Sequence, residues 1–401
     1  MAKARNWIAM FVLIAVVGGC QCGPKFLENS KIEITELSGP ASLEKAATTV
    51  QAAAFLDDGH ALASLIQDTD GDGIFTGADR ASIWKVELRS KSWEELTDSA
   101  ATSCFLPDSG FAIGTRPVVN NRILYHRVAE DTDSDGLLTT VDNVELWSMK
   151  TDGSDPRPVI TEGSPRLADV SEQSGRIIYS VRNMSLGKDF YLATAEGASP
   201  TRIPIPNMVS ACFEPEGEMF TAVVENAAGM SLELVNPQDN YSHKNMLVGN
   251  SLLYFAPRWS EDGTTLLAHV CRDADADGRI YINDPGEILT INVQTGDVEQ
   301  LTLTPAADNR LGGVWGEFGR VLFMGADPTS DEHFRGIRLM AVPVGGGEAK
   351  DLYCCFNSAL KVFLAPSLNK KRFLVDLWND TNADGRVDGA DRSTLGLIEV
   401  R

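Results

Sequence analysis

The residues best suited to chemistry in this chain are the acidic side chains of four twelve-residue loops that share one spacing. Each loop has Asp at positions one, five and twelve, Asp or Asn at position three, and Gly at position six. Ca²⁺ takes about 6–8 oxygen ligands at about 2.3–2.6 Å, and a tight loop can supply them from positions one, three, five, seven and twelve. Glycine at position six permits the sharp bend. The spacing therefore predicts up to four Ca²⁺ ions with a structural role.

The predicted ligands are the side chains at positions one, three, five and twelve and the backbone carbonyl at position seven, where the side chains cannot ligate. They are Asp68, Asp70, Asp72, Ile74 and Asp79; Asp131, Asp133, Asp135, Leu137 and Asp142; Asp273, Asp275, Asp277, Arg279 and Asp284; and Asp380, Asn382, Asp384, Arg386 and Asp391. Position twelve carries Asp, where helix-flanked calcium loops usually carry a bidentate Glu, so we expect water to complete the coordination.

Acid and glycine clusters also mark solvated turns that bind nothing. The repetition of one spacing after four apolar runs favours metal, because three or four carboxylates crowded in one loop repel one another without it. An intermediate interpretation stays open, in which one or two loops have lost affinity, the loop with Asn382 first.

Residues 1–19 have the features of a targeting segment, with a basic start at Lys3 and Arg5 and an apolar run over 7–17 that is too short to span a bilayer. The segment resembles a bacterial lipoprotein signal. That resemblance implies that Cys20 is acylated, that residues 20–30 form a lipidated tether, and that the lipid is the only membrane attachment. Gln21 in place of Asp favours the outer membrane of the bacterial cell envelope. Secretion with cleavage nearby is the alternative.

The formal net charge of −21 excludes nucleic acid as an expected partner. Four bound Ca²⁺ ions would add eight positive charges and bring it to −13. Outside the cytoplasm calcium is millimolar, so loops with dissociation constants of about 10⁻⁴–10⁻³ M suffice there. The acidity is therefore mostly explained by the ligand set.

The cysteines show no metal-ligand spacing. Beyond Cys20 they are Cys22, Cys104, Cys212, Cys271, Cys354 and Cys355. Six cysteines allow 15 pairings, so disulfides and buried thiols both stay open.

The elements that must position the loops recur with a period of about 40 to 60 residues from about residue 49 onward, a pattern typical of solenoids and propellers. Each unit has a strand, a polar turn, a second strand, a loop, a third strand and a short fourth strand. Third strands are predicted over 83–89, 144–150, 190–194, 231–235, 287–293, 337–342 and 394–400, and fourth strands over 93–96, 157–161, 201–205, 245–248, 298–302 and 350–353.

The seventh unit has no fourth strand of its own, because the chain stops just after its third strand. Residues 31–37 alternate with period two and can close the ring as the outer strand of the last blade. The sequence therefore predicts an all-β, seven-bladed β-propeller of four-stranded antiparallel blades over 31–401. Six or eight blades stay open, because the insertion near 104–114 can be mistaken for part of a blade.

The chain resembles the TolB-like, WD-repeat-like β-propeller family of exported bacterial proteins, most clearly over Pro257 to Gly263 and Gly296 to Thr302. Propellers with acidic loops between second and third strands are known as calcium blades, and the four loops match them residue for residue. Blades three, four and six depart from that pattern, and we expect them to carry no metal. If the blades are ordinary ones, the four acidic loops share one face of the disc, and those of blades seven, one and two are neighbours once the ring closes.

No catalytic residues are predicted, because the sequence contains no nucleophile elbow and no zinc-protease motif. The tryptophans Trp84, Trp147, Trp259, Trp315 and Trp378 lie in or beside predicted strands, which favours packing between blades over a carbohydrate platform. We expect a binding or scaffolding module with a protein partner in the envelope. The alternative is a polysaccharide-active lyase or hydrolase in the central channel, with His126, His269 and His333 converging on a metal.

Overall fold

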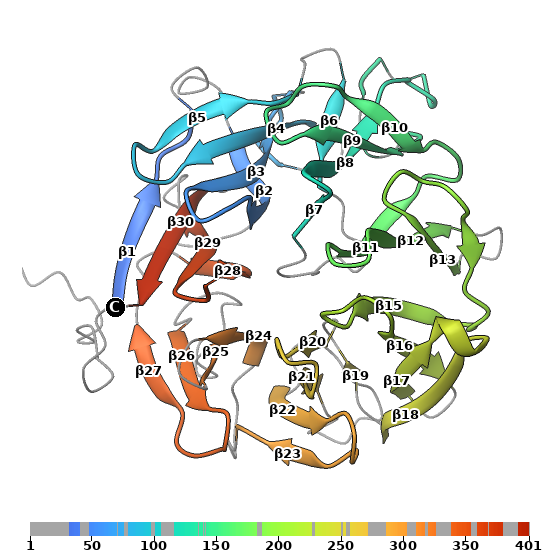
Figure 1. The fold of residues 1–401 in the computed structure, drawn as a ribbon. Coiled ribbons are helices and arrows are strands. Elements are labelled where there is room, and N and C mark those ends of the chain that lie inside the picture. Colours follow the sequence, from blue (N-terminus) through green and yellow to red (C-terminus); the bar gives the residue numbers. More distant parts are fainter. Residues whose placement is uncertain are drawn as a thin grey trace, which may run out of the picture.

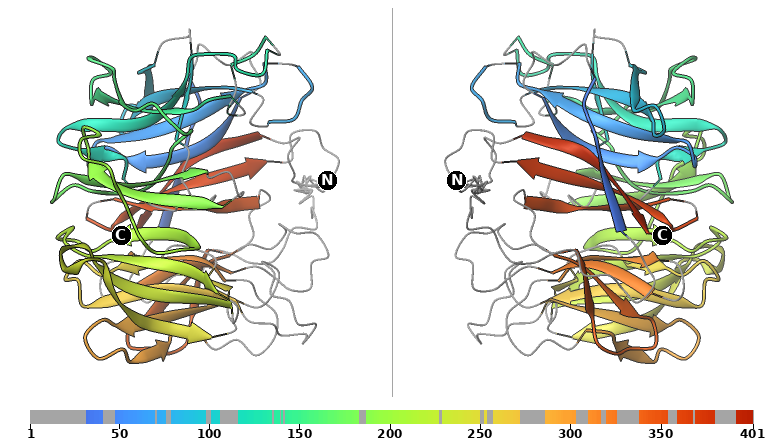
Figure 2. Two further views of the ribbon diagram at one scale, coloured as in Figure 1. Left: turned by 90° about the vertical axis from the view of Figure 1, so that its right-hand side faces the viewer. Right: turned by 90° about the vertical axis from the view of Figure 1, so that its left-hand side faces the viewer.

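Seven antiparallel sheets form a closed ring in the computed structural model, each sheet one blade of a β-propeller (Figure 1). The structure describes residues 32–40, 48–69, 71–75, 79–97, 101–105, 116–134, 136–138, 140, 142–182, 187–226, 229–249, 252–253, 257–271, 286–302, 310–316, 320–325, 338–353, 359–367, 369–379 and 392–400. Figure 2 shows the ring from the side as a disc. The predicted all-β fold and the blade number of seven are confirmed.

Blades 1 to 4 follow one another along the chain. Blade 1 contains β2 (Thr48–Phe55), β3 (His60–Gln67), β4 (Arg80–Glu87) and β5 (Ser92–Glu95). Blade 2 contains β6 (Thr102–Cys104), β7 (Val118–Val119), β8 (Arg122–Val128), β9 (Glu145–Lys150) and β10 (Arg157–Ile160). Blade 3 contains β11 (Arg166–Ser171), β12 (Arg176–Arg182), β13 (Lys188–Thr194) and β14 (Thr201–Arg202). Blade 4 contains β15 (Met208–Phe213), β16 (Phe220–Asn226), β17 (Gly229–Asn236) and β18 (Ser242–Gly249), with a 3-10 turn η2 (Pro237–Asp239).

Blades 5 to 7 complete the ring. Blade 5 contains β19 (Leu252–Leu253), β20 (Arg258–Trp259), β21 (Thr265–Cys271), β22 (Gly286–Asn292) and β23 (Val298–Gln300). Blade 6 contains β24 (Arg310–Gly316), β25 (Arg320–Gly325), β26 (Arg338–Pro343) and β27 (Lys350–Tyr353). Blade 7 contains β28 (Ala359–Pro366), β29 (Arg372–Asn379) and β30 (Arg392–Val400), and its outer strand is β1 (Ile32–Leu37).

The middle strands are apolar on both faces because each blade lies between two others. On β3, Leu62 packs toward blade 2, while its neighbours Ala61 and Ala63 pack toward blade 7. Alternating side chains of a strand point to opposite faces, so a strand buried on both sides is a nearly continuous apolar run. Similar clusters join each further pair of neighbouring blades up to blade 6. The core is therefore divided into layers between blades.

The ring closes by pairing the two ends of the described chain, as predicted. Strand β1 runs antiparallel to β30, with a register from Ile32↔Val400 to Leu37↔Leu395. A second link is polar and buried, since Thr49 Oγ1 of blade 1 and Ser393 Oγ of blade 7 lie 2.9 Å apart. Ser393 Oγ also accepts the Val50 N–H at 3.0 Å. Pairing with β1 covers the edge of β30 that would otherwise be free, and the Ser393 contacts join blade 7 to blade 1.

Four fourth strands differ in length from their predictions, β18 and β14 most, while β23 and β10 end two residues and one residue early. Strand β18 covers eight residues, because the long β17 pairs with it from Met230↔Gly249 to Asn236↔Ser242. Strand β14 covers only two residues, pairing at Tyr191↔Arg202 and Leu192↔Thr201. In blade 2 the first strand is split, since β6 and β7 both pair with β8 around the insertion.

The predicted signal segment 1–19, the tether 20–30 and Cys20 lie outside the described residues. Among the residues that are described, no helix is long and apolar enough to cross a bilayer.

Candidate metal-binding loops and the central cavity

The acidic loop of blade 1 connects β3 to β4 and folds around its own carboxylates. Asp68 Oδ1 accepts the Gly71 N–H at 2.7 Å, and its Oδ2 accepts the Gly73 N–H at 3.2 Å. Asp79 closes the loop from the far side, where its Oδ1 accepts the Thr69 N–H at 2.8 Å. Its side chain is buried, with the residue only 1% exposed. The first and last acids of the motif therefore both organise the backbone of the loop.

The acidic loop of blade 2 repeats this arrangement between β8 and β9. Asp131 Oδ1 accepts the Ser134 N–H at 2.6 Å, and Asp131 Oδ2 accepts the Gly136 N–H at 2.8 Å. Asp142 Oδ1 accepts the Thr132 N–H at 2.6 Å, and the residue is 3% exposed. Two loops 63 positions apart in the sequence thus have the same internal hydrogen bonds. Their shared spacing specifies a shared fold.

Three of the predicted ligands in blade 2 converge. Carboxylate oxygens of Asp131, Asp133 and Asp142 all lie within 4.8 Å of one another. Oxygens bound to one Ca²⁺ at about 2.3–2.6 Å can be at most about 5 Å apart, so this separation is compatible with a single shared ion. Asp142 is buried, whereas Asp131 and Asp133 are exposed, so an ion here would be reached from the surface.

The remaining predicted ligands are only partly described. In blade 1, Asp72 accepts the Ile74 N–H at 2.7 Å, and Ile74 is an exposed apolar side chain. Leu137 lies in the blade 2 loop, between β8 and β9. Asp70, Asp135 and both further loops, from Asp273 to Asp284 and from Asp380 to Asp391, lie outside the described residues. Their proposed role stays a prediction.

Sequence reasoning overlooked the threonine at position two of each described loop. Thr69 Oγ1 donates to Asp79 Oδ1 at 3.2 Å and accepts the Arg80 N–H at 3.3 Å. Thr132 Oγ1 donates to Asp142 Oδ1 at 2.9 Å and accepts an N–H in the same way, from Asn143 at 3.3 Å. The recurrence of Asp-Thr at the start of the loops could have revealed this hydroxyl bridge.

A cavity of about 310 Å³ lies at the centre of the ring. Its lining comes from the ends of first strands and from the turns that follow them: Arg116, Val118, Asp169, Val170, Glu172, Cys212, Phe213, Pro215, Arg258, Trp259, Trp315, Pro366 and Lys370. Since neighbouring strands of a blade are antiparallel, these turns and the acidic loops lie on opposite faces of the disc. The two candidate sites are therefore separate.

The charged groups of the cavity are held by contacts between blades. Asp169 of blade 3 accepts the Phe213 N–H of blade 4 at 2.7 Å, and Arg116 of blade 2 pairs with Glu172 of blade 3 at 2.5 Å. Burial lowers the pKa of Arg258, although Cys212 and Asp169 nearby oppose the shift. Burial also raises the pKa of the Cys212 thiol well above its usual value, which keeps it neutral.

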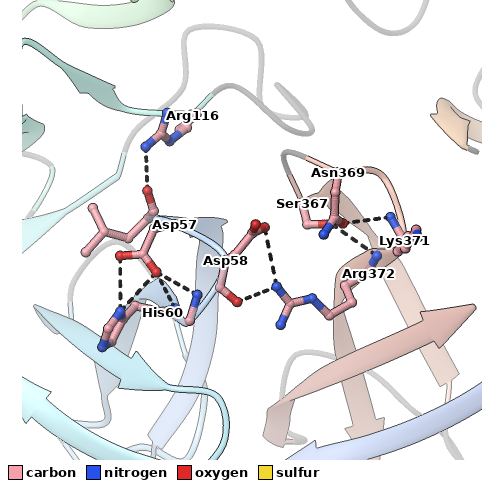
Figure 3. Close-up of polar contacts among 10 residues, drawn as sticks. Asp57, Asp58, His60, Arg116, Ser367, Asn369, Lys371 and Arg372 are labelled. Carbon is pink, nitrogen blue, oxygen red and sulfur yellow. Dashed lines mark hydrogen bonds and ion pairs between the residues drawn. The ribbon is translucent and has the colours of Figure 1, made fainter.

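The turns around the cavity are tied together across blades 7, 1 and 2, as Figure 3 shows. Arg372 of blade 7 donates to the backbone carbonyl of Asp58 in blade 1, with the Asp58 carboxylate at 3.4 Å. Arg116 of blade 2 donates to the Leu56 carbonyl at 2.5 Å. Asp57 accepts the His60 N–H at 2.9 Å, which fixes the turn between β2 and β3.

Two cavity tryptophans join neighbouring first strands. Trp259 Nε1 donates to the Cys212 carbonyl at 3.3 Å, and Trp315 Nε1 donates to the Arg258 carbonyl at 3.2 Å. Trp84, by contrast, is packed in the layer between blades 1 and 7. Packing between blades is therefore found at Trp84 and Trp259, and Trp259 and Trp315 also have a second role as cavity lining.

The two described histidines of the enzyme hypothesis, His126 and His269, lie in different blades. His126 lies on β8 in blade 2, where its Nε2 accepts the Leu167 N–H of blade 3 at 3.2 Å. Burial lowers its pKa to about 3, with a further contribution from Arg166, so the ring is neutral. His269 is buried on β21 in blade 5, and His333 lies outside the described residues. Among the described residues that line the cavity there is no histidine.

The chain matches no protein-family model and no curated protein. Solved propellers do match it by structure. An oligogalacturonate lyase in complex with manganese has a TM-score of 0.59 at 12% identity, over 94% of this chain and 96% of the lyase. An acylaminoacyl peptidase has a TM-score of 0.58 at 12% identity, over 90% of this chain and 52% of the peptidase.

This chain thus spans about half the length of that peptidase. A candidate TolB from Agrobacterium tumefaciens is also similar, with a TM-score of 0.44 at 16% identity over 69% of this chain and 90% of that one. The propeller fold that the predicted TolB-like resemblance implies is confirmed by the seven-bladed ring itself. Identities this low establish the fold alone.

Proposed function

We propose that this protein is a lipid-anchored β-propeller of the bacterial cell envelope whose second-to-third-strand loops bind Ca²⁺ and whose ring serves as a binding module for a protein partner. The observation that carries the proposal is the common fold of the two described acidic loops, together with the convergence of Asp131, Asp133 and Asp142. Ca²⁺ prefers oxygen ligands in such loops.

In blade 2 the ion would be held by Asp131, Asp133, Asp135, the Leu137 carbonyl and Asp142. Calcium would neutralise carboxylates that repel one another and would stabilise the folded chain by mass action, because the unfolded loop is not preorganised. The two described sites would lie in neighbouring blades, with up to two more in blades 5 and 7. This role is structural and involves no reaction.

The anchor and the partner are tested together in cells. The wild-type protein should incorporate labelled palmitate in cells and a Cys20→Ser variant should not, because Cys20 is the proposed site of acylation. Affinity capture from solubilised envelopes should recover one protein partner with calcium and less of it with EDTA. A wild-type protein without the label would contradict the anchor, and recovery of the same proteins in a mock capture would contradict the binding role.

A polysaccharide-active enzyme of the envelope is the second candidate. The observation that favours it is the polar cavity, in which Arg116, Asp169, Glu172 and Arg258 meet aromatic side chains. The positions of His126 and His269 away from that cavity weigh against a histidine-bound metal centre there. Incubation with acidic and neutral polysaccharides, with and without Mn²⁺, separates the two candidates, and we expect no cleavage.

A further inference from the structure

One charged group of the central cavity lacks the partner that the others have. Arg116 is paired with Glu172, and Lys370 is paired with Glu261 at 3.0 Å. Arg258 lies on β20 in the cavity wall and is partly buried. Among the described residues, no hydrogen bond or ion pair to its guanidinium is found, and the Asp169 carboxylate nearby favours its charged form. A buried cation without such a partner is costly in free energy.

The surroundings of Arg258 favour an anion with an apolar or ring-shaped body. Two of the three lining cations are already in ion pairs, Arg116 with Glu172 and Lys370 with Glu261, so Arg258 is the lining cation left to meet an anion among the described residues. Trp259, Trp315 and Phe213 add aromatic surface, and both indole N–H groups are already used between blades. A guanidinium binds a carboxylate through two parallel hydrogen bonds.

We propose that the central cavity binds a small carboxylate ligand, whose carboxylate pairs with Arg258 and whose body lies against Trp259 and Trp315. The volume of about 310 Å³ corresponds to roughly one ring or a short peptide end, at the small end of ligand pockets. The carboxylate could come from an acidic sugar or from a peptide C-terminus. This site is independent of the acidic loops, which lie on the opposite face.

The test uses two carboxylate probes, galacturonate and hippurate, each with a neutral analogue, methyl galactoside and hippuramide. Saturation-transfer NMR on the full-length protein should give a dissociation constant of about 1 mM or tighter for at least one carboxylate probe. Its neutral analogue should bind at least about tenfold more weakly, because the charge-assisted hydrogen bonds are lost. Binding of galacturonate alone identifies an acidic sugar, and binding of hippurate alone identifies a peptide end.

Two substitutions locate the site. Arg258→Met should weaken the binding of the carboxylate probe by about tenfold to one hundredfold. Arg202→Met removes an equal charge from the outer strand β14 and should leave the dissociation constant unchanged. If Arg258→Met does not fold, the test is made by measuring binding of the carboxylate probe to Arg258→Lys and binding of the neutral analogues to the wild type. Failure of both carboxylate probes to bind, equal binding of the neutral analogues, or full binding by a folded Arg258→Met would overturn the proposal.

Discussion

The connection between second and third strands is built in two ways in this ring, and blades 2 and 4 show the difference. In blade 4, the backbone of β16 pairs with that of β17 as far as Asn226↔Gly229, which leaves only two residues of the sequence between the paired ends. In blade 2, pairing of β8 with β9 ends at Arg127↔Glu145. Beyond that point the backbone N–H groups bind Asp131 and Asp142 instead.

In blade 4, backbone pairing alone stabilises the connection, and no bound ion is needed. In blade 2, by contrast, several carboxylates lie close together in the loop. Their Oδ atoms hold the loop by accepting N–H groups, but the negative charges still repel one another. A cation that binds the converging oxygens removes that repulsion. The same position in a repeated fold can therefore be either self-sufficient or dependent on an ion.

The largest expected effect comes from removing the buried carboxylate that closes the blade 2 loop. Asp142→Ala leaves the Thr132 N–H and hydroxyl without their acceptor, and we expect a loss of about 3 kcal/mol in the free energy of unfolding. Urea denaturation in EDTA measures it without a contribution from metal. The control is Glu225→Ala at the exposed end of β16, which should change stability by less than about 0.5 kcal/mol. Equal losses in both variants would show that the two connections do not differ.

The next largest effect is the pH dependence of folding stability that comes from His126. This residue lies where blade 2, which has an acidic loop, bonds to blade 3, which has none. Its folded pKa of about 3 lies below the ordinary value of 6.5, so the unfolded chain binds one more proton between these values. Stability should therefore fall as pH drops from about 6.5 toward 3, by ~1.4 kcal/mol per pH unit.

His126→Gln keeps an acceptor for the Leu167 N–H but does not titrate. The stability of the wild type relative to this variant should therefore decrease between pH 6 and pH 4, as measured by urea denaturation at each pH. Parallel curves for the two proteins would contradict the buried, neutral histidine.

A smaller effect is expected from backbone strain in the acidic loops. Gly73 has φ of 79°, a conformation that costs an L side chain about 1 kcal/mol, while the space around it is open. Gly73→Ala should therefore lower the midpoint of thermal unfolding slightly. Gly39→Ala should leave this midpoint unchanged, because neither a positive φ nor a neighbouring atom opposes a methyl group there. A larger loss for Gly39→Ala would contradict the assigned turn.

The smallest effect concerns the outer strand of blade 3, which has no acidic loop. Arg202 and Asp189 form an ion pair at 2.7 Å, with the Arg202 side chain largely exposed. Arg202→Ala should leave the midpoint of urea denaturation unchanged within the error of the measurement, at low and at high salt, because water and ions screen an exposed pair. A clear loss of stability at low salt would show that surface ion pairs, and not carboxylate loops, account for local stability differences.

Much of the fold could be predicted from the sequence, because each unit repeats the same order of strands and turns. Strand β1 could be assigned to the last blade, since its period-two alternation is typical of a strand and the last unit lacked a fourth strand. The length of β18 could not be predicted from the sequence, because it depends on the length of β17, the strand with which it pairs.

The loops were found by spacing alone, because each motif folds locally and its ligands lie within twelve residues. The cavity was missed because its residues, such as Asp169, Arg258 and Lys370, come from different blades and share no local pattern.

The most direct test of the account is thermal unfolding of the wild type and of an Asp68→Asn/Asp131→Asn double variant, each with Ca²⁺ and with EDTA. We predict that EDTA lowers the unfolding temperature of the wild type, since calcium at one hundred times its dissociation constant adds about 2.7 kcal/mol per site. The double variant should show a smaller shift, because the blade 1 and blade 2 sites are lost. A wild-type unfolding temperature that is the same in Ca²⁺ and in EDTA would contradict the central claim.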